Sequence, residues 1–300
     1  MRKSSTEVSA GPRRLSAATV VVGVIGDPVA HSLSPLLHNT AFAELGMDWV
    51  SVGFRVPAGR ATEALAGADA MGIRGLSVTM PHKETVTGLV DRASPLAQRL
   101  GAVNCVVFGT DGRTGTFGDN TDGAGLLASL WRGAHFDPGG RRCLVVGAGG
   151  AARAVVAALA DAGAAEVVVL NRTAERAVVA SALAGPAGRP GAPEDASACD
   201  LVVNATPLGM PGTSAGHGGM WPVDPRLLRT GQTVVDLVYE PAMTPWLQAA
   251  RDRGATIVNG HGMLVHQAAL QLAAWTGLDP PVESMWAALD PPDASEGQVR

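Results

Sequence analysis

Hydrophobic residues follow two alternating patterns along most of this 300-residue chain. Short, nearly continuous apolar runs rich in Val and Ile, such as residues 20–25 and 143–146, are typical of strands buried on both faces. Longer Ala- and Leu-rich segments, such as residues 151–162, lie between these runs and favour helices. The alternation predicts an α/β fold with mainly parallel sheets covered by helices.

The expected elements cover most of the chain. Strands are expected at residues 20–25, 49–56, 75–78, 103–108, 143–146, 167–170, 201–204, 233–237 and 256–258. Helices are expected at 35–45, 60–70, 81–89, 95–100, 123–131, 151–162, 174–183, 245–253 and 263–275, with a last one near 281–289. The Gly- and Pro-rich stretches 184–193 and 210–222 are expected to be mobile loops, and residues 1–18 and 290–300 disordered tails. The polar stretch 131–142 is the best candidate for a domain junction.

Composition and charge exclude several classes of protein. The net charge of −4 and the pI near 6.0 leave no basic footprint for nucleic acid. No apolar stretch approaches the roughly 20 residues that a membrane span needs, and the run at 20–25 is too short for a signal peptide. Three widely separated cysteines suit a reducing cytoplasm, and the histidines lack metal-ligand spacing. We therefore expect a cytoplasmic protein without a metal.

Residues 143–152 read CLVVGAGGAA, a strand followed by a glycine turn and a helix start. Gly147, Gly149 and Ala152 match the G-x-G-x-x-G/A pattern, in which the backbone approaches a pyrophosphate at a helix N-terminus. A merely tight turn is the alternative, but the flanking strand and helix favour dinucleotide binding.

The second strand of this unit indicates which dinucleotide is bound. An acidic residue at its end would favour NAD, yet the strand at 167–170 is followed by Asn171-Arg172-Thr173, with Arg176 one turn later. Guanidinium groups can bind a 2′-phosphate, so NADP is the expected cofactor. The alternative is that both arginines lie on a solvated helix face.

Two further helix starts carry polar residues. Ser34 is a natural N-cap before Pro35, and Ser32 adds a second hydroxyl, so this turn could hold a carboxylate or could only cap the helix. In the stretch SVTMPHK (77–83), Pro81 is placed to open a helix. Lys83 then falls in the first turn, the unfavourable end of the helix dipole for a cation.

These segments occur in one order with several others. The set is HSLSPLLHN (31–39), SVTMPHK (77–83), GAVN (101–104), GDNTDG (118–123), GAGGAAR (147–153), NRT (171–173), NATPLGM (204–210), DLVYEP (236–241) and GHGMLVHQA (260–268). Together they resemble shikimate dehydrogenase over residues 20–276. The resemblance implies an NADP-dependent enzyme, monomeric or homodimeric, that interconverts shikimate and 3-dehydroshikimate. It also implies a substrate domain at 19–122, completed by helices at 262–289, and an NADP-binding Rossmann-like domain at 123–261, with the active site in the cleft between them.

The resemblance also implies roles for individual residues. Lys83 and Asp122 would form the catalytic pair, and Ser32 and Ser34 would bind the substrate carboxylate. Around the ring and its hydroxyls would lie Ser77, Thr79, Asn104, Tyr239 and Gln267. The cofactor would be bound by Gly147, Ala148, Gly149, Gly150, Ala151, Asn171, Arg172, Thr173, Arg176, Thr206 and Gly260. Taken singly, Asn104 could be a turn residue, Gln267 a surface amide and Asp122 a helix cap.

A catalytic role gives the lysine a rationale. Oxidation of a secondary alcohol requires a group that takes the hydroxyl proton. A helix N-terminus and burial disfavour the ammonium form, whereas a nearby Asp122 carboxylate favours it. Tyr239 is a less favoured base. His82, beside the lysine, is expected to face outward from the helix.

Two positions depart from the family pattern. Ser77 stands where the family usually has Asn, which leaves the exact polyol open, and Cys105 stands where it usually has Thr, which we expect to affect only packing. A paralogue acting on quinate or an aminoshikimate is therefore one alternative. A dinucleotide-binding regulatory module without turnover is another, and the intact Lys83 and Asp122 argue against it.

Overall fold

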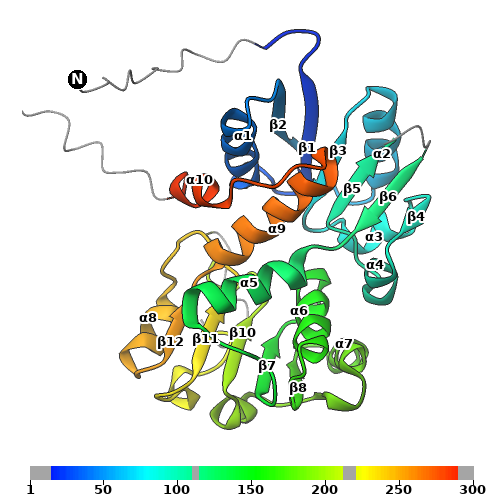
Figure 1. The fold of residues 1–300 in the computed structure, drawn as a ribbon. Coiled ribbons are helices and arrows are strands. Elements are labelled where there is room, and N and C mark those ends of the chain that lie inside the picture. Colours follow the sequence, from blue (N-terminus) through cyan, green and yellow to red (C-terminus); the bar gives the residue numbers. More distant parts are fainter. Residues whose placement is uncertain (1–14, 110–114, 212–220, 290–300) are drawn as a thin grey trace, which may run out of the picture.

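The computed structural model describes residues 15–109, 115–211 and 221–289, which form two six-stranded sheets (Figure 1). The chain completes the first sheet by Asp119 and begins the second at Arg142. Figure 1 shows the two sheets in separate halves of the molecule, with two long helices between them. The expected α/β class with mainly parallel sheets is confirmed.

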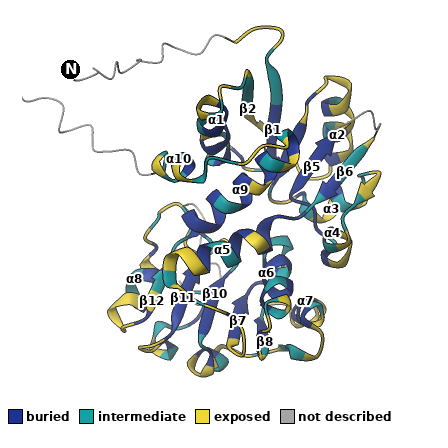
Figure 2. Ribbon diagram, viewed as in Figure 1, coloured by how far each residue is buried: buried dark blue, intermediate teal, exposed yellow. Residues whose placement is uncertain are grey.

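The first sheet has the strand order β2-β1-β3-β5-β6-β4. Its strands are β1 (Val20–Gly26), β2 (Trp49–Arg55), β3 (Gly75–Val78), β4 (Arg92–Ala93), β5 (Cys105–Phe108) and β6 (Thr116–Asp119). Strand β1 pairs in parallel with β2 and β3, and β4 with β6, whereas β5 is antiparallel to both of its neighbours. Strands β1, β3 and β5 are the buried centre of this sheet (Figure 2).

The helices of the first half come from both ends of the described chain. They are α1 (Ser34–Glu44), α2 (Ala61–Ala70), α3 (Lys83–Thr87), α4 (Pro95–Leu100), α9 (Gly260–Thr276) and α10 (Val282–Ala287). Leu272 of α9 and Met285 of α10 lie in one buried cluster with Val22 of β1. Trp275 Nε1 donates a 3.0 Å hydrogen bond to the Val106 carbonyl. The C-terminal helices therefore complete the core of the first half.

The second sheet is parallel throughout, with the order β12-β11-β10-β7-β8-β9. Its strands are β7 (Arg142–Val146), β8 (Glu166–Leu170), β9 (Gly188–Pro190), β10 (Leu201–Asn204), β11 (Thr233–Asp236) and β12 (Thr256–Val258). Around it lie α5 (Asp122–Ala134), α6 (Gly150–Asp161), α7 (Ala174–Ser181), α8 (Pro245–Asp252) and the short 3₁₀ helices η1 (Ala182–Ala187), η2 (Pro193–Ala198) and η3 (Pro225–Leu227). From β7 the chain runs first to β8 on one side and later to β10 on the other, which opens a crevice at the carboxyl ends of β7 and β10.

Helices α5 and α9 cross between the two sheets (Figure 1). Glycines allow the close approach, because a Cβ on Gly125 of α5 would lie 2.9 Å from the Gln267 amide nitrogen of α9. A Cβ on Gly123 would lie 2.9 Å from the Ala154 carbonyl oxygen of α6. The start of α5 is therefore fixed against helices of both halves, α9 and α6.

Some expected boundaries are wrong for identifiable reasons. The stretch 184–193 is not a mobile loop: it contains the end of the 3₁₀ helix η1 and the edge strand β9. Arg189 fixes this stretch through ion pairs with Glu166 and Asp195, both at 2.7 Å. Strands β4 and β6 were not expected, since they are short and carry no apolar run. Residues 15–18 of the expected N-terminal tail are described, with the Ser16 amide donating to Thr19 Oγ1. The rest of that tail, residues 290–300 and most of the stretch 210–222 lie outside the described residues.

Candidate active site

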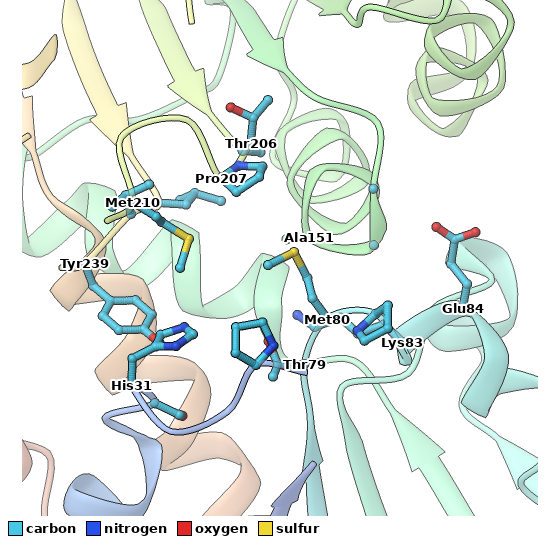
Figure 3. A pocket seen from close by; sticks show the side chains of 18 of the residues that line it. His31, Thr79, Met80, Lys83, Glu84, Ala151, Thr206, Pro207, Met210 and Tyr239 are labelled. Carbon is cyan, nitrogen blue, oxygen red and sulfur yellow. The ribbon is translucent and has the colours of Figure 1, made fainter. Parts of the chain in front are cut away.

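Two adjoining pockets lie where the carboxyl ends of strands from both sheets meet, and Figure 3 shows the outer one. The outer pocket, of about 600 Å³, is lined on one side by the Gly149–Ala151 turn and on the other by residues around Met80. The inner pocket, of about 150 Å³, lies deeper, and both are lined by Thr79, Lys83 and Tyr239. A long cofactor and a small substrate can therefore meet at Lys83.

The inner pocket brings together most of the residues expected to bind substrate. Its polar lining consists of Ser32, Ser34, Ser77, Thr79, Lys83, Asp122, Tyr239 and Gln267. These residues come from five separate parts of the sequence, near positions 32–34, 77–83, 122, 239 and 267. The pocket is therefore assembled by the fold and not by any local motif.

Lys83 and Asp122 form a close, largely buried ion pair. Lys83 Nζ donates to Asp122 Oδ2 at 2.5 Å, and only 15% and 4% of the two side chains are exposed. Asn104 Nδ2 donates to the other carboxylate oxygen at 2.7 Å, while the Asp122 amide donates to Asn120 Oδ1. One oxygen of Asp122 is thus fixed by the protein, and the other faces the amine.

Asn104 lies behind this pair and is absent from the pocket lining. Its Oδ1 accepts a 2.8 Å hydrogen bond from the Thr121 amide, so it fixes the first residues of α5. Gln267 does line the pocket, and its Oε1 accepts a hydrogen bond from Gln271 Nε2 at 2.9 Å. Asn104 therefore orients Asp122, whereas Gln267 presents an amide to the cavity.

Lys83 is the first residue of the short helix α3, two residues later than expected for a helix beginning at Pro81. The residue before it, His82, occupies the N-cap position and is only 1% exposed, so the expectation of an outward-facing side chain is wrong. His82 Nε2 lies 2.7 Å from the Val56 carbonyl oxygen. This buried contact ties the start of α3 to the chain that leaves β2, and so holds Lys83 in place.

The serine turn also differs in detail from the expectation. Leu33 and not Ser34 is the N-cap of α1, and no side chain caps that helix. Ser32 Oγ instead accepts a hydrogen bond from the Ser34 amide at 3.3 Å.

Burial raises the pKa of the Tyr239 hydroxyl, and its contact with Ser32 opposes this rise. A phenol with a raised pKa keeps its proton near neutral pH, so Tyr239 is suited to donate a hydrogen bond.

The glycine turn after β7 has the geometry required for phosphate binding. Gly147 has a φ of +119°, and a Cβ there would also lie 2.9 Å from the Ala205 carbonyl oxygen. Gly149, the N-cap of α6, differs: a Cβ there would meet nothing within 4 Å. The protein thus leaves open space at the N-terminus of α6, where backbone N–H groups favour a pyrophosphate. A Cβ on Gly150 would lie 3.1 Å from Lys83 Cβ, so this turn also packs against Lys83.

The residues expected to bind the cofactor fall into two groups. The outer pocket is lined by Gly149, Gly150, Ala151, Arg176 and Thr206, and Gly260 lines the inner pocket. The remaining expected residues do not line either pocket: Gly147, Ala148, Asn171, Arg172 and Thr173. Asn171 Nδ2 donates to the Thr173 carbonyl and so shapes the turn after β8. Arg172 is exposed beside it, at the end of the strand that precedes Arg176.

A buried network fixes two of the loops that line the outer pocket. Asn204 Nδ2 donates to Asp236 Oδ1 at 2.8 Å, and Asn204 Oδ1 accepts from Thr206 Oγ1 at 2.6 Å. Asp236 also accepts from Thr244 Oγ1 and from the Val238 amide. Burial raises the pKa of the Asp236 carboxyl, and these three donors oppose the rise. The network joins the loop after β10 to the turn after β11.

Several residues at the site were not expected from the sequence. His31, Met80 and Glu84 line the outer pocket and appear around it in Figure 3. His31 and Glu84 are direct neighbours of Ser32 and Lys83, which is the signal that could have identified them. Within the described ranges, no helix is long and apolar enough to cross a membrane, and no cluster of His, Cys, Asp and Glu could hold a metal ion.

A parallel nucleotide-binding sheet, a glycine turn at a helix N-terminus and a buried Lys–Asp pair define the class of dinucleotide-dependent dehydrogenases. Comparison with known proteins identifies the family. Residues 24–106 match the shikimate dehydrogenase substrate binding domain, residues 134–205 the shikimate/quinate 5-dehydrogenase model, and residues 260–289 the shikimate 5′-dehydrogenase C-terminal domain.

Individual relatives align with this chain over nearly its whole length. The shikimate dehydrogenase (NADP(+)) of Moorella thermoacetica is 46% identical over 288 residues, covering 91% of this chain and 93% of that protein. The solved structure of the Thermus thermophilus enzyme with NADP(H) and shikimate has a TM-score of 0.81 at 38% identity, covering 90% and 98% of the two chains. A quinate dehydrogenase from Corynebacterium glutamicum with NAD has a TM-score of 0.80 at 32% identity, also covering 90% and 98%. The chain belongs to the shikimate dehydrogenase family.

Proposed function

We propose that this protein is an NADP-dependent dehydrogenase that reversibly oxidises shikimate to 3-dehydroshikimate. The main evidence for this proposal is the position of the Lys83–Asp122 pair. Both residues line the small inner pocket, and Lys83 also lines the outer pocket next to the glycine turn. The family supports both the substrate and the cofactor.

The chemistry follows from the pair. NADP⁺, when bound, accepts the hydride from the substrate carbon that bears the hydroxyl. The neutral amine of Lys83 takes the hydroxyl proton as the C–O bond becomes a carbonyl, and it returns the proton in the reverse direction. The Asp122 carboxylate stabilises the ammonium that forms, and Asn104 keeps the carboxylate in place.

The pocket lining supports distinct binding roles. Ser32 and Ser34 are proposed to bind the substrate carboxylate, while Thr79, Tyr239 and Gln267 face the ring hydroxyls. Ser77 lines the same pocket, and its short side chain leaves room for water where an asparagine would reach further. Cys105 is buried on β5 outside the pocket lining, which fits a packing role.

On the cofactor side, Arg172 and Arg176 are proposed to bind the 2′-phosphate, and the N-terminus of α6 the pyrophosphate. Residues 147–151, the turn 171–173, Thr206 and Gly260 are proposed to complete that site.

The division into domains follows the two sheets. We assign residues 19–122 with 262–289 to the substrate domain and 123–261 to the NADP-binding domain. The protein is proposed to act in the cytoplasm as a monomer or homodimer.

A side-by-side assay tests the function. With NADP⁺ as cofactor, purified protein should oxidise shikimate at a higher kcat/KM than quinate or aminoshikimate. This kcat/KM should also exceed the value measured with NAD⁺ for any of the three substrates. A higher kcat/KM with quinate and NAD⁺ would assign the protein to the quinate branch of the family. Cofactor binding without turnover of any substrate would indicate a regulatory module.

A further inference from the structure

Glu84 links the two halves of the molecule across the outer pocket. It is the second residue of α3, directly after Lys83, and it lines the outer pocket (Figure 3). Arg176 Nη2 of α7 donates to Glu84 Oε1 at 3.3 Å. Arg153 Nη1 of α6 lies 3.9 Å from the other carboxylate oxygen. One carboxylate from the first half thus faces two arginines of the nucleotide-binding half.

The two arginines differ in what they can still bind. Arg176 is 56% exposed and is the proposed ligand of the 2′-phosphate. Arg153 is in the first turn of α6 and only 19% exposed, and its Nε is buried without a hydrogen-bond partner within the described part of the chain. Arg153 is therefore held close to Glu84, and it can remain the counter-ion of the carboxylate if Arg176 leaves.

We propose that Glu84 competes with the 2′-phosphate for Arg176 and so sets how strongly the protein prefers NADP over NAD. This inference rests on the proposed function, because it takes Arg176 as a ligand of the 2′-phosphate. A phosphate dianion is the stronger partner for a guanidinium, so binding of NADP⁺ transfers Arg176 from Glu84 to the phosphate. Glu84 then keeps Arg153 as its counter-ion. NAD⁺ lacks the phosphate and leaves the Glu84–Arg176 contact intact.

Competition of Glu84 with the 2′-phosphate for Arg176 can be distinguished from simple charge repulsion between Glu84 and the phosphate. If Glu84 acts by holding Arg176, removal of its charge strengthens NADP⁺ binding only while Arg176 is present. A general repulsion between Glu84 and the phosphate would persist without Arg176. The two explanations are therefore separated by a double-mutant cycle.

The experiment measures Kd for NADP⁺ and NAD⁺ by isothermal titration calorimetry. It uses the parent protein, Glu84→Gln, Arg176→Leu and the double variant. Glu84→Gln should tighten NADP⁺ binding about two- to fivefold, the range expected for a partly exposed ion pair, and leave NAD⁺ binding unchanged. In the Arg176→Leu background the same change should have no effect on either Kd.

Glu175→Gln is the matched control. Glu175 is exposed next to Arg176 on α7, and it takes part in none of the ion pairs found among the described residues. Its replacement removes the same charge nearby and should alter NADP⁺ binding less than Glu84→Gln does.

Three results would overturn the inference: no gain in NADP⁺ affinity in Glu84→Gln, an equal gain for NAD⁺, or a gain that survives in Arg176→Leu. A parent protein that oxidises shikimate with NADP⁺ and gives one of these results retains the proposed function and loses only the role of Glu84. A parent protein that binds neither cofactor loses both.

Discussion

Lys83 is unusual among the basic residues of this chain. Of the 23 Lys and Arg residues, only Lys3 and Lys83 are lysines. Arginine stays protonated under all ordinary conditions, whereas a lysine amine can release and regain a proton in a suitable environment. A purely structural ion pair with Asp122 could use either residue. The presence of lysine at this one buried position therefore favours proton transfer, and the count was available from the sequence alone.

The serine turn provides the first prediction at the scale of single residues. Ser32→Ala and Ser34→Ala should each raise KM for shikimate, because a hydrogen bond to a charged group is worth about 1.5–3 kcal/mol. Cofactor affinity should change little, since both serines belong to the turn before α1 and not to the glycine turn at the α6 N-terminus. Steady-state kinetics with both substrates varied measures this. An unchanged KM for shikimate in both variants would remove the serines from the carboxylate site.

The two arginines after β8 lead to a prediction about cofactor preference. Replacement of both Arg172 and Arg176 by Leu should erase most of the preference for NADP⁺, with kcat/KM for NADP⁺ falling about 10²-fold and that for NAD⁺ nearly constant. The fall reflects loss of charge-assisted contacts with the phosphate. The ratio of kcat/KM for the two cofactors is the measurement. An equal fall in kcat/KM for NADP⁺ and NAD⁺ would show that the arginines stabilise the fold and do not bind the 2′-phosphate.

At the scale of elements, sequence patterns predicted the buried strands well and the polar ones poorly. Strands β1, β3, β7, β8 and β10 consist mainly of apolar runs, and the structure places them within a residue of the expected bounds. Strands β4, β6 and β9 lack such runs and depend on pairing with neighbours that only the fold supplies. The start of α3 was misplaced because His82 is held by the distant Val56 carbonyl, a contact that local sequence does not reveal.

The packing of α9 on β3 gives a prediction with an internal control. A Cβ on Gly75 would lie 2.2 Å from Trp275 Nε1, so Gly75→Ala must displace α9 and should destabilise the protein by about 1–3 kcal/mol. Gly67→Ala, in α2 where a Cβ meets nothing, should stabilise it by roughly 0.5–1 kcal/mol. Chemical denaturation measures both. Gly75→Ala should also raise KM for shikimate, because α9 carries Gln267. Similar stability changes in the two variants would contradict this packing.

His38 of α1 gives a pH prediction. It lies 3.0 Å from Ser51 Oγ of β2 and packs edge-on against Trp275 of α9, and burial lowers its pKa to about 3. Since the unfolded state binds the proton near pH 6.5, this group's contribution is fully present above that pH and is lost as the pH falls toward 3. The parent should lose up to about 1.4 kcal/mol more per pH unit than His38→Gln between pH 6 and 4.5. If the free energy of unfolding falls with pH at the same slope in the parent and in His38→Gln, His38 is not a buried neutral histidine.

At the scale of the whole molecule, the site depends on the two halves being placed against each other. Lys83 comes from α3 of the first half, Asp122 from the start of α5, and the Gly150 turn after β7 packs on the lysine. The motifs indicated that these residues belong to one site. They could not indicate that Glu84 reaches Arg176, because that contact depends on how α3 and α7 face each other across the outer pocket.

The most direct test of proton transfer by Lys83 is the turnover of Lys83→Ala with shikimate and NADP⁺. We expect a kcat about 10²–10⁴-fold below that of the parent, with much smaller changes in KM for shikimate and in Kd for NADP⁺. Ethylamine added in solution should restore part of the rate in Lys83→Ala and have no effect on the parent, because it replaces only the missing amine. A kcat within a few-fold of the parent in folded, cofactor-binding Lys83→Ala would show that Lys83 does not transfer the proton.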